Sequence, residues 1–251
     1  MSQTSQTTYR YLLKSARMLA ANTRHLVFEC EDKTSFSYAP GQFISIHIPT
    51  TGKAIRRNFS IANPPTGNGE IELACAYVLN GLATTLLSNI KEGEAIDISG
   101  PYGLLLLKEE DPQRYIFVAT GTGITPYRSM LPNLARRLEA KADLEIVVLF
   151  GARTLESLLY VDEFLDFAKQ HPRFRYMAAL SQDSPSDLSF ASKGYVQHQF
   201  ESLNLKPGSD FIYLCGNPNM IDQSFTALIE AGFDRKAIKR EKYISGPLTA
   251  A

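Results

Sequence analysis

The 251-residue sequence has few cysteines, no excess of either charge and no long apolar run. Its three cysteines, Cys30, Cys75 and Cys215, are widely spaced and predict neither a disulfide framework nor a metal cluster. The sequence contains no four-cysteine spacing of the kind that binds an iron–sulfur centre. Its 26 basic residues equal its 26 acidic residues, so the net charge gives no reason to expect nucleic acid as a partner. A local basic patch for an acidic protein remains compatible with this balance.

The apolar stretches are also too short to cross a bilayer. The stretch at residues 146–150 is an example of the longest ones. The amino terminus is polar and has no apolar run of signal-peptide length. We therefore expect a cytoplasmic protein without membrane insertion. The four histidines lie apart without ligand spacing, so they predict no metal site: His25, His47, His171 and His198. Hydrophobic residues make up 44% of the chain, which favours a packed globular fold.

The first hundred residues have the pattern of short strands. Apolar and β-branched residues alternate within each stretch, and Gly, Pro and Asn separate the stretches. Six short strands separated in this way predict an antiparallel barrel or sandwich. The expected strands cover residues 9–19, 23–29, 43–48, 57–62, 71–77 and 95–98.

Beyond the charged stretch at residues 108–113, strands alternate with helical patterns. This order predicts an α/β domain with a Rossmann-like parallel sheet and helices on both faces. We expect the barrel domain over residues 1–107 and the α/β domain over residues 113–251. The buried strands expected in the second domain cover residues 115–119, 144–150, 174–180 and 211–214.

The first strand of the second half runs into Thr120-Gly121-Thr122-Gly123-Ile124-Thr125-Pro126. Glycines let the backbone approach a phosphate, and a helix amino terminus offers unpaired N–H groups to an anion. Thr125 before Pro126 is typical of a helix cap followed by proline in the first turn. The alternative is a tight strand–helix turn without a ligand. The segment is not the six-residue dinucleotide fingerprint.

Three further motifs carry candidate chemistry, although each alone is explained as well by ordinary structure. In Arg57-Asn58-Phe59-Ser60, an arginine able to neutralise a pyrophosphate precedes an aromatic ring and a hydroxyl able to contact a flavin. The stretch that begins at Gly81 reads as a helix start capped by Thr84. The third motif, a strand running into a helix start, is Cys215-Gly216-Asn217-Pro218-Asn219-Met220.

Taken together and in this order, the motifs resemble those of the ferredoxin–NADP reductase family. The family's arginine-x-aromatic-serine pattern is met by Arg57, Phe59 and Ser60, and its glycine-x-x-serine/threonine helix start by Gly81 and Thr84. The resemblance covers roughly residues 9–244. Its other matches are Gly100-Pro101-Tyr102-Gly103, the segment from Gly121 to Pro126, Gly151-Ala152-Arg153 with Tyr160 and Glu163, and the segment from Cys215 to Met220.

The resemblance implies a six-stranded antiparallel Greek-key β-barrel that binds FAD, followed by a Rossmann-like nicotinamide-binding domain, with FAD and NADP(H) as cofactors. It assigns FAD binding to Arg57, Phe59, Ser60 and Thr84. It implies that Ser60, near flavin N5, and Cys215, near the hydride path, are the catalytic residues. The residues that it places around the nicotinamide dinucleotide are Gly121, Thr122, Gly123, Pro126, Arg153, Gly216 and Met220.

The sequence departs from the family pattern at two places. NADP-specific relatives often carry Ser-Arg after the third strand of the second domain, where this chain has Ser181-Gln182. Arg153 remains as a phosphate partner, so we expect a modest preference for NADPH over NADH. Many relatives end in an aromatic residue stacked on the flavin, whereas this chain continues past Tyr243. Tyr243 either stacks in the same way or has another role, and Glu241 is either a proton relay or an exposed surface carboxylate.

These residues favour an FAD-dependent reductase that exchanges electrons between NADP(H) and a ferredoxin or flavodoxin, as a monomer. The flavin takes a hydride and returns single electrons, so no catalytic triad or metal is required. One alternative is the NAD(P)H-dependent reductase component of an oxygenase, or a free-flavin reductase. Another is a non-catalytic regulatory subunit that keeps the fold, which the intact Arg57, Ser60, Thr122 and Cys215 argue against.

Overall fold

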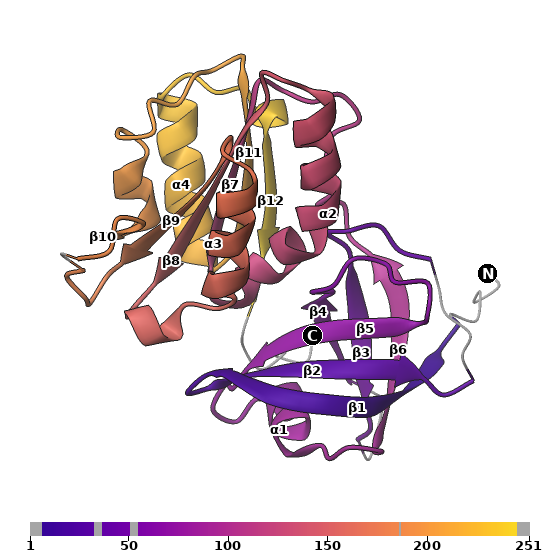
Figure 1. Cartoon of the computed structure of the whole chain (residues 1–251). Helices are drawn as coiled ribbons and strands as arrows, with labels where there is room; N and C mark the ends of the chain where they lie inside the picture. Colours follow the sequence, from indigo (N-terminus) through magenta and orange to yellow (C-terminus); the bar gives the residue numbers. More distant parts are fainter. Residues whose placement is uncertain (1–6, 33–36, 51–54, 186, 245–251) are drawn as a thin grey trace. The chain divides into compact units, whose positions relative to one another are not determined.

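The computed structural model describes residues 7–32, 37–50, 55–185 and 187–244 (Figure 1). Its contacts divide the chain after Leu106 into two compact units, the second of which is Leu107–Ile244. Each unit is built on one six-stranded sheet. We call them unit 1 and unit 2. Within the described ranges, no helix is long and apolar enough to cross a membrane.

Unit 1 has an antiparallel sheet in the strand order β4-β3-β6-β1-β2-β5. This confirms the expected antiparallel six-stranded architecture. Buried aliphatic and aromatic side chains from all of these strands except β4 form its core, and Phe59 of β4 packs against that core. The elements are β1 (Tyr9–Ala20), β2 (Thr23–Cys30), β3 (Phe43–Ile48), β4 (Ile55–Ser60), β5 (Glu70–Ala76), α1 (Leu82–Asn89) and β6 (Ala95–Tyr102).

The segment after β4 brings the two edge strands of this sheet together. The Ala62 N–H donates to the Glu72 carbonyl of β5 at 2.7 Å. The Glu72 N–H donates to Asn63 Oδ1 at 2.7 Å, and the Asn63 amide donates to the Glu70 carbonyl at 3.1 Å. Asn63 is buried, so these bonds satisfy a polar side chain that would otherwise destabilise the fold. The sheet therefore curls on itself, as the barrel architecture requires.

Unit 2 has a parallel sheet in the order β10-β9-β8-β7-β11-β12. The expected parallel α/β domain is confirmed. Two short strands, β10 and β12, were not expected from the sequence. The elements are β7 (Arg114–Thr120), α2 (Thr125–Ala140), β8 (Glu145–Ala152), α3 (Val161–Gln170), β9 (Phe174–Leu180), β10 (Ala191–Lys193), β11 (Asp210–Gly216), α4 (Pro218–Glu230) and β12 (Ile238–Lys242).

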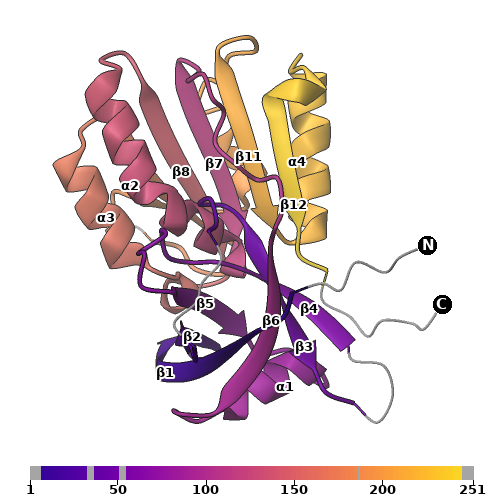
Figure 2. The same cartoon turned by 90° about the vertical axis from the view of Figure 1, so that its right-hand side faces the viewer.

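Helices cover both faces of the parallel sheet, with α2 and α3 on one face and α4 on the other (Figure 2). On the first face, Tyr127 of α2 packs on Phe117 of β7 with ring centroids 4.9 Å apart. Ile221 and Leu228 of α4 pack on the second face in the same cluster as Ile116 of β7. Burial on both sides explains why β7, β8 and β11 are nearly continuous apolar runs.

Candidate functional site

The turn after β7 begins as a 3-10 turn, Gly121–Ile124, that leads directly into α2. Gly121 has φ 55°, and a Cβ there would meet open space. The expectation that Thr125 caps the helix is wrong: Ile124 holds the cap position, and no side chain caps this helix start. Thr125 lies within the first turn, where its hydroxyl donates to the Thr122 carbonyl. Pro126 is in the first turn, as the sequence predicts.

The turns after β7 and β11 interlock through their glycines. A Cβ on Gly123 would lie 2.3 Å from the Cys215 carbonyl oxygen, and one on Gly216 would lie 2.5 Å from the Thr120 carbonyl oxygen. The Asn217 N–H donates to Thr120 Oγ1 at 3.0 Å. Only glycine permits such close backbone approach. The fold therefore brings together two of the motifs found in the sequence. Their residues Thr120 and Cys215 are 95 positions apart along the chain.

The two helix starts at this junction differ in their hydrogen bonding. At α4, the Asn217 side chain accepts from the backbone N–H of Asn219 at 2.8 Å and of Met220 at 3.3 Å. At α2, neither a side-chain cap nor an acidic residue occupies the first turn. The first N–H groups of a helix have no partner within it. At the β7 turn the helical segment starts with the 3-10 turn Gly121–Ile124, which has no side-chain cap, and the Thr125 N–H at the start of α2 already donates to the Thr122 carbonyl. The amides of the 3-10 turn can therefore bind an anion, whereas Asn217 already occupies the start of α4.

Cys215 lies beneath this junction and is fully buried. Burial raises the pKa of its thiol well above the ordinary value, and the nearby Glu241 carboxylate raises it further, while a hydrogen bond from Tyr243 acts to lower it. The thiol is therefore neutral at physiological pH, which excludes thiolate chemistry. Tyr127, also fully buried, donates its hydroxyl to the Val118 carbonyl at 3.1 Å, and burial raises its pKa well above the ordinary value.

The edge strand β12 brings two further candidates to Cys215. Cys215 pairs with Glu241 in the parallel register, and the Tyr243 N–H donates to the Gly216 carbonyl at 2.8 Å. Glu241 is half-buried rather than exposed, so its interpretation as a surface carboxylate is wrong. The sequence singled out both residues but not the strand that positions them.

The loops after β8 and β9 lie side by side at the same carboxyl edge of the sheet. The Ser181 N–H donates to the Ala152 carbonyl at 3.0 Å, and the Gln182 N–H donates to the Arg153 carbonyl at 2.8 Å. The Leu155 N–H donates to a carboxylate oxygen of Asp183 at 2.6 Å. The exposed Arg153 side chain has no hydrogen bond or ion pair with any described residue. Sequence reasoning singled out Arg153 and Gln182 here and missed Asp183.

Arg128 connects α2 to the start of α3. Its Nε donates to Glu163 at 2.6 Å, and its guanidinium lies 4.7 Å from the centroid of the Tyr160 ring. Tyr160 has φ 57°, in the left-handed region that non-glycine residues rarely adopt. The stacking and the ion pair together stabilise this conformation. Tyr160 and Glu163 belong to one of the segments that resemble the family. Both are held by Arg128, which the sequence analysis did not single out.

In unit 1, β4 is an edge strand that carries the candidate flavin residues. Arg57 and Phe59 lie on one face of β4, and Ser60 lies on the other, because side chains alternate along a strand. Arg57 is half-buried, and one of its terminal nitrogens donates to the Arg56 carbonyl at 2.9 Å. A guanidinium has five N–H donors, so within the part of the chain that the structure describes, Arg57 keeps further N–H groups for an anion. Ser60 is buried.

The helix start at Gly81 also differs from the expected one. Gly81 holds the cap position of α1, and Thr84 is the third helical residue, so the prediction that Thr84 caps the helix is wrong. The Thr84 hydroxyl instead donates to the Gly81 carbonyl at 3.0 Å and accepts from the Val78 N–H at 3.2 Å. No side chain caps α1, and its first turn has no acidic residue. Its amide groups can therefore bind a phosphate.

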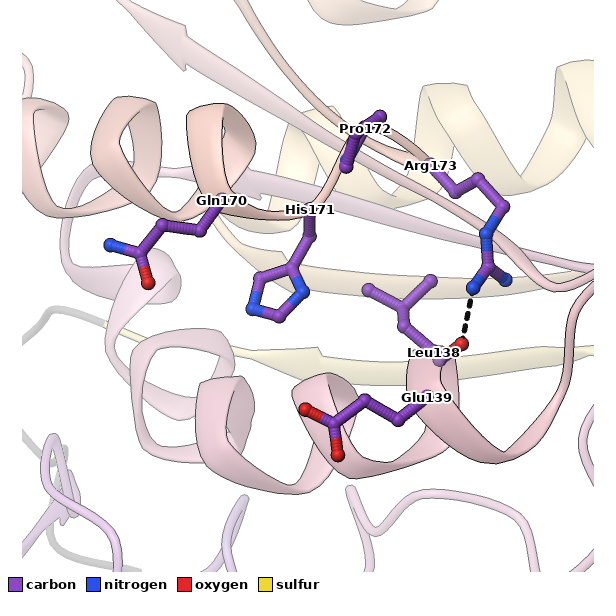
Figure 3. A pocket seen from close by; sticks show the side chains of 6 residues that line it. All are labelled: Leu138, Glu139, Gln170, His171, Pro172 and Arg173. Carbon is purple, nitrogen blue, oxygen red and sulfur yellow. Dashed lines mark hydrogen bonds between the residues drawn. The ribbon is translucent and has the colours of Figure 1, made fainter.

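A cavity of about 210 Å³ lies at the opposite, amino edge of the parallel sheet (Figure 3). The guanidinium of Arg173 is directed there at the end of α2 and donates to the carbonyls of Leu138, Lys141 and Leu144. These bonds satisfy the carbonyls at the helix end, so the arginine is structural. We assign no function to this cavity. Its lining residues are Leu138, Glu139, Gln170, His171, Pro172 and Arg173.

Two protein families match the chain, one for each unit. The family described as oxidoreductase FAD-binding domain matches residues 10–106. The family described as oxidoreductase NAD-binding domain matches residues 117–225. Both candidate anion sites therefore lie in domains whose families bind a nucleotide cofactor.

Individual relatives fall into two groups. Ferredoxin–NADP reductase B of Sorangium cellulosum is 34% identical, over 92% of this chain and 96% of that protein. The reductase component 2 of terephthalate 1,2-dioxygenase from Comamonas sp. is 32% identical over 84% of this chain, which spans only 60% of that protein. The fold matches a solved ferredoxin NADP⁺ reductase of Neisseria gonorrhoeae with bound FAD and NADP, at a TM-score of 0.78 and 18% identity, covering 96% of this chain and 99% of that one. The chain belongs to the ferredoxin–NADP reductase-like family of flavoprotein oxidoreductases, which bind FAD and a nicotinamide dinucleotide.

Proposed function

We propose that the protein is a ferredoxin or flavodoxin reductase that exchanges electrons between NADP(H) and a one-electron carrier. The observation that carries this proposal is the junction of the turns after β7 and β11. There, Gly123 and Gly216 hold an uncapped helix start beside a buried, neutral thiol. Such a junction can bind a dinucleotide phosphate at the amides of the 3-10 turn Gly121–Ile124 and leave an apolar, uncharged wall for a nicotinamide ring.

The residues of unit 1 fit FAD. The partly free guanidinium of Arg57 and the uncapped amides of α1 provide two kinds of donor that suit a pyrophosphate. Bound FAD would accept two electrons as a hydride and return them one at a time. Phe59 would pack on the flavin ring and the Ser60 hydroxyl would hydrogen-bond its edge. Thr84 would act by holding the first turn of α1, because its hydroxyl is already bonded to the backbone.

The residues of unit 2 fit a nicotinamide dinucleotide. Thr122 and Pro126 would line the nicotinamide pocket, and Met220 would close it from α4. Cys215 would contact the nicotinamide as a neutral side chain that orients the ring without adding charge, and Tyr243 would hold the thiol in place through their hydrogen bond. The Arg153 side chain has no partner among the described residues, so it would be able to pair with a 2′-phosphate, which supports a modest preference for NADPH.

The alignment with the Sorangium reductase supports ferredoxin as the electron acceptor, because it extends over 96% of that protein. The second candidate is the reductase component of an oxygenase. The 32% identity to the terephthalate dioxygenase component favours it, although the chain spans about three fifths of that relative. In either case unit 1 would bind the flavin and unit 2 the dinucleotide.

The test is stopped-flow reduction of the purified protein by NADPH and by NADH, followed by mixing with ferredoxin, flavodoxin and free flavin. We expect flavin bleaching by NADPH and rapid reoxidation by at least one of the two carriers. Reoxidation by free flavin alone would replace the carrier assignment with a free-flavin reductase. A protein that is not reduced by either nucleotide would overturn the enzymatic function.

The FAD assignment is tested by comparing Arg57→Ala with Arg56→Ala. The two arginines are adjacent on β4, but alternation places them on opposite faces, so Arg56→Ala is a matched control for charge and position. We expect one non-covalent FAD in the wild type and in Arg56→Ala, and loss of FAD on gel filtration of Arg57→Ala. Release of FMN instead of FAD on heating, or equal retention in both variants, would contradict the role of Arg57.

A further inference from the structure

The last strand of unit 2, β12, forms the edge of the parallel sheet beside β11 (Figure 2). The N–H of Tyr243, the residue after the strand, donates to the Gly216 carbonyl of β11. Successive residues of a strand direct their backbone N–H and C=O groups to alternate sides, so those of Arg240 and Lys242 point away from β11. No other described residue bonds these backbone groups. The edge therefore offers donors and acceptors to an added strand.

Two arginines share one aromatic ring beside this edge. The guanidinium of Arg240 lies 3.8 Å from the centroid of the Phe225 ring of α4, and that of Arg235 lies 5.9 Å from the same centroid. Both arginines are exposed, and neither has a hydrogen bond or ion pair with any described residue. Contact with the ring orients a guanidinium while its N–H groups stay available to an acceptor. The edge thus carries two oriented cations that no described carboxylate neutralises.

The other charged side chains around β12 leave this excess of cations in place. The Asp222 carboxylate of α4 lies 2.6 Å from the Lys242 ammonium and is therefore already paired. On the opposite face of the strand, Lys239 lies near Lys108, and burial followed by the Lys108 charge lowers the pKa of Lys239. The charges of the whole chain balance, so this edge is a locally basic surface.

The charges decide which strand the edge can accept. A second copy of β12 would place cations opposite cations, which destabilises a strand pair. An extended segment rich in Asp and Glu would instead place carboxylates within reach of Arg240 on one face and Lys239 on the other. Main-chain hydrogen bonds to the open edge would supply affinity, and the cations would select an acidic segment against others.

We propose that the outer edge of β12 binds an extended acidic segment of a partner protein, which adds to the six-stranded parallel sheet as a further strand. Arg235 and Arg240 belong to none of the nucleotide-binding motifs, and the binding requires neither FAD nor a dinucleotide. The interaction surface therefore goes beyond the proposed function and is tested independently of it.

The test uses labelled peptides of about ten residues, the length of a long strand, and the full-length, FAD-loaded protein. In the first peptide Glu alternates with Thr, and in the second Lys replaces Glu. The third has the sequence of the first but carries N-methyl groups on alternate amides, so it keeps the charge and cannot extend the sheet. Binding is measured by fluorescence anisotropy. We expect the Glu peptide to bind at least about tenfold more tightly than either of the other two.

Arg240→Glu reverses one charge of the edge and should exchange the preference between peptides. We expect about tenfold weaker binding of the Glu peptide and tighter binding of the Lys peptide. Arg136→Glu is the matched control, since it makes the same change at an exposed arginine of α2, and both affinities should stay within about twofold of the wild type. The gain for the Lys peptide cannot come from misfolding, which would weaken the binding of both peptides.

Three results would overturn the proposal. They are no binding of the Glu peptide to the wild type at about 1 mM, equal binding of the N-methylated peptide, and equal effects of Arg240→Glu and Arg136→Glu. If Arg240→Glu binds neither peptide, Arg235→Glu decides, because Arg235 precedes the strand and its backbone does not pair with β11. An exchanged preference in Arg235→Glu supports the acidic partner, and affinities equal to those of the wild type contradict it.

Discussion

The turns after β7 and β11 have the same plan, a parallel strand followed by glycine and then a helix with proline in its first turn, yet they differ in how the helix start is satisfied. Asn217 caps α4 with its own side chain, whereas the 3-10 turn Gly121–Ile124 that leads into α2 has no side-chain cap. A turn that satisfies its own helix start is a structural connection. A turn that leaves its amides open retains the capacity to bind an anion. Helix α1 of unit 1 follows the second plan.

The largest expected effect comes from forcing the two turns apart. Gly123→Ala places a Cβ against the Cys215 backbone, which cannot move without disturbing β11. We expect a loss of about 3 kcal/mol in the free energy of unfolding, and loss of NADP⁺ binding. Gly121→Ala is the control, since its Cβ meets open space and only its φ of 55° is unfavourable, at about 1 kcal/mol. Urea unfolding of both variants measures the difference; equal losses would contradict the interlock.

Alkaline pH should reveal a second difference between the two turns, because the buried thiol of Cys215 lies beside the turn after β11. The unfolded chain releases this proton near its ordinary pKa of 9.0, whereas burial raises the folded pKa above it. The resulting stability is complete below pH 9 and is lost as the pH rises further, by up to about 1.4 kcal/mol per pH unit. Cys215→Ala should therefore lose stability less steeply between pH 9 and pH 10 in urea titrations. Parallel slopes in the two proteins would contradict the raised pKa.

Removing the cap of α4 should affect stability but not ligand binding. Asn217→Ala leaves the Asn219 and Met220 N–H groups without their acceptor, at a cost of about 1 kcal/mol. We expect NADP⁺ affinity to stay within about twofold of the wild type, by calorimetry. Asn219→Ala, two residues further along the chain at an exposed position, serves as the control for stability. A large loss of NADP⁺ affinity in Asn217→Ala would remove the distinction between the two turns.

The smallest effect is expected away from both turns, on β9. Among described residues, the Tyr176 hydroxyl is the only buried side-chain polar atom without a hydrogen-bond partner. Tyr176→Phe removes this unsatisfied group and keeps the ring stacked on Phe164. We expect the free energy of unfolding to be unchanged or to rise by about 1 kcal/mol. A clear loss of stability would mean that the hydroxyl has a partner, such as a bound water.

Much of the fold could be predicted because its strands have strong local patterns. The apolar runs of β7, β8 and β11 are buried on both faces, and the alternating strands of unit 1 are separated by Gly and Pro. The edge strand β12 was missed because Lys239, Arg240, Glu241 and Lys242 give it neither an apolar run nor alternation. Its strand conformation comes from pairing with β11, which is a tertiary effect.

The helix starts show why local signals were less reliable for the site. Thr84 and Thr125 are good caps by residue type, but each lies inside its helix and bonds the backbone of the preceding turn. Asn217 before Pro218 carries the same kind of signal and is a true cap, so it was available in the sequence. The approach of Gly123 to Cys215 and the bond of Asp183 to Leu155 join distant residues, and no local pattern announces them.

The edge position of β12 has a consequence for which changes of length the chain tolerates. Parallel pairing places Glu241 opposite Cys215, and the residue on either side of Glu241 is a cation. One residue inserted between Ile238 and Arg240 would shift the following residues by one position, so that Arg240 instead of Glu241 would lie opposite Cys215. The same insertion at Gly232, before the strand, leaves its pairing intact. Among homologues, we therefore expect loop lengths to vary before β12 and to be invariant within it.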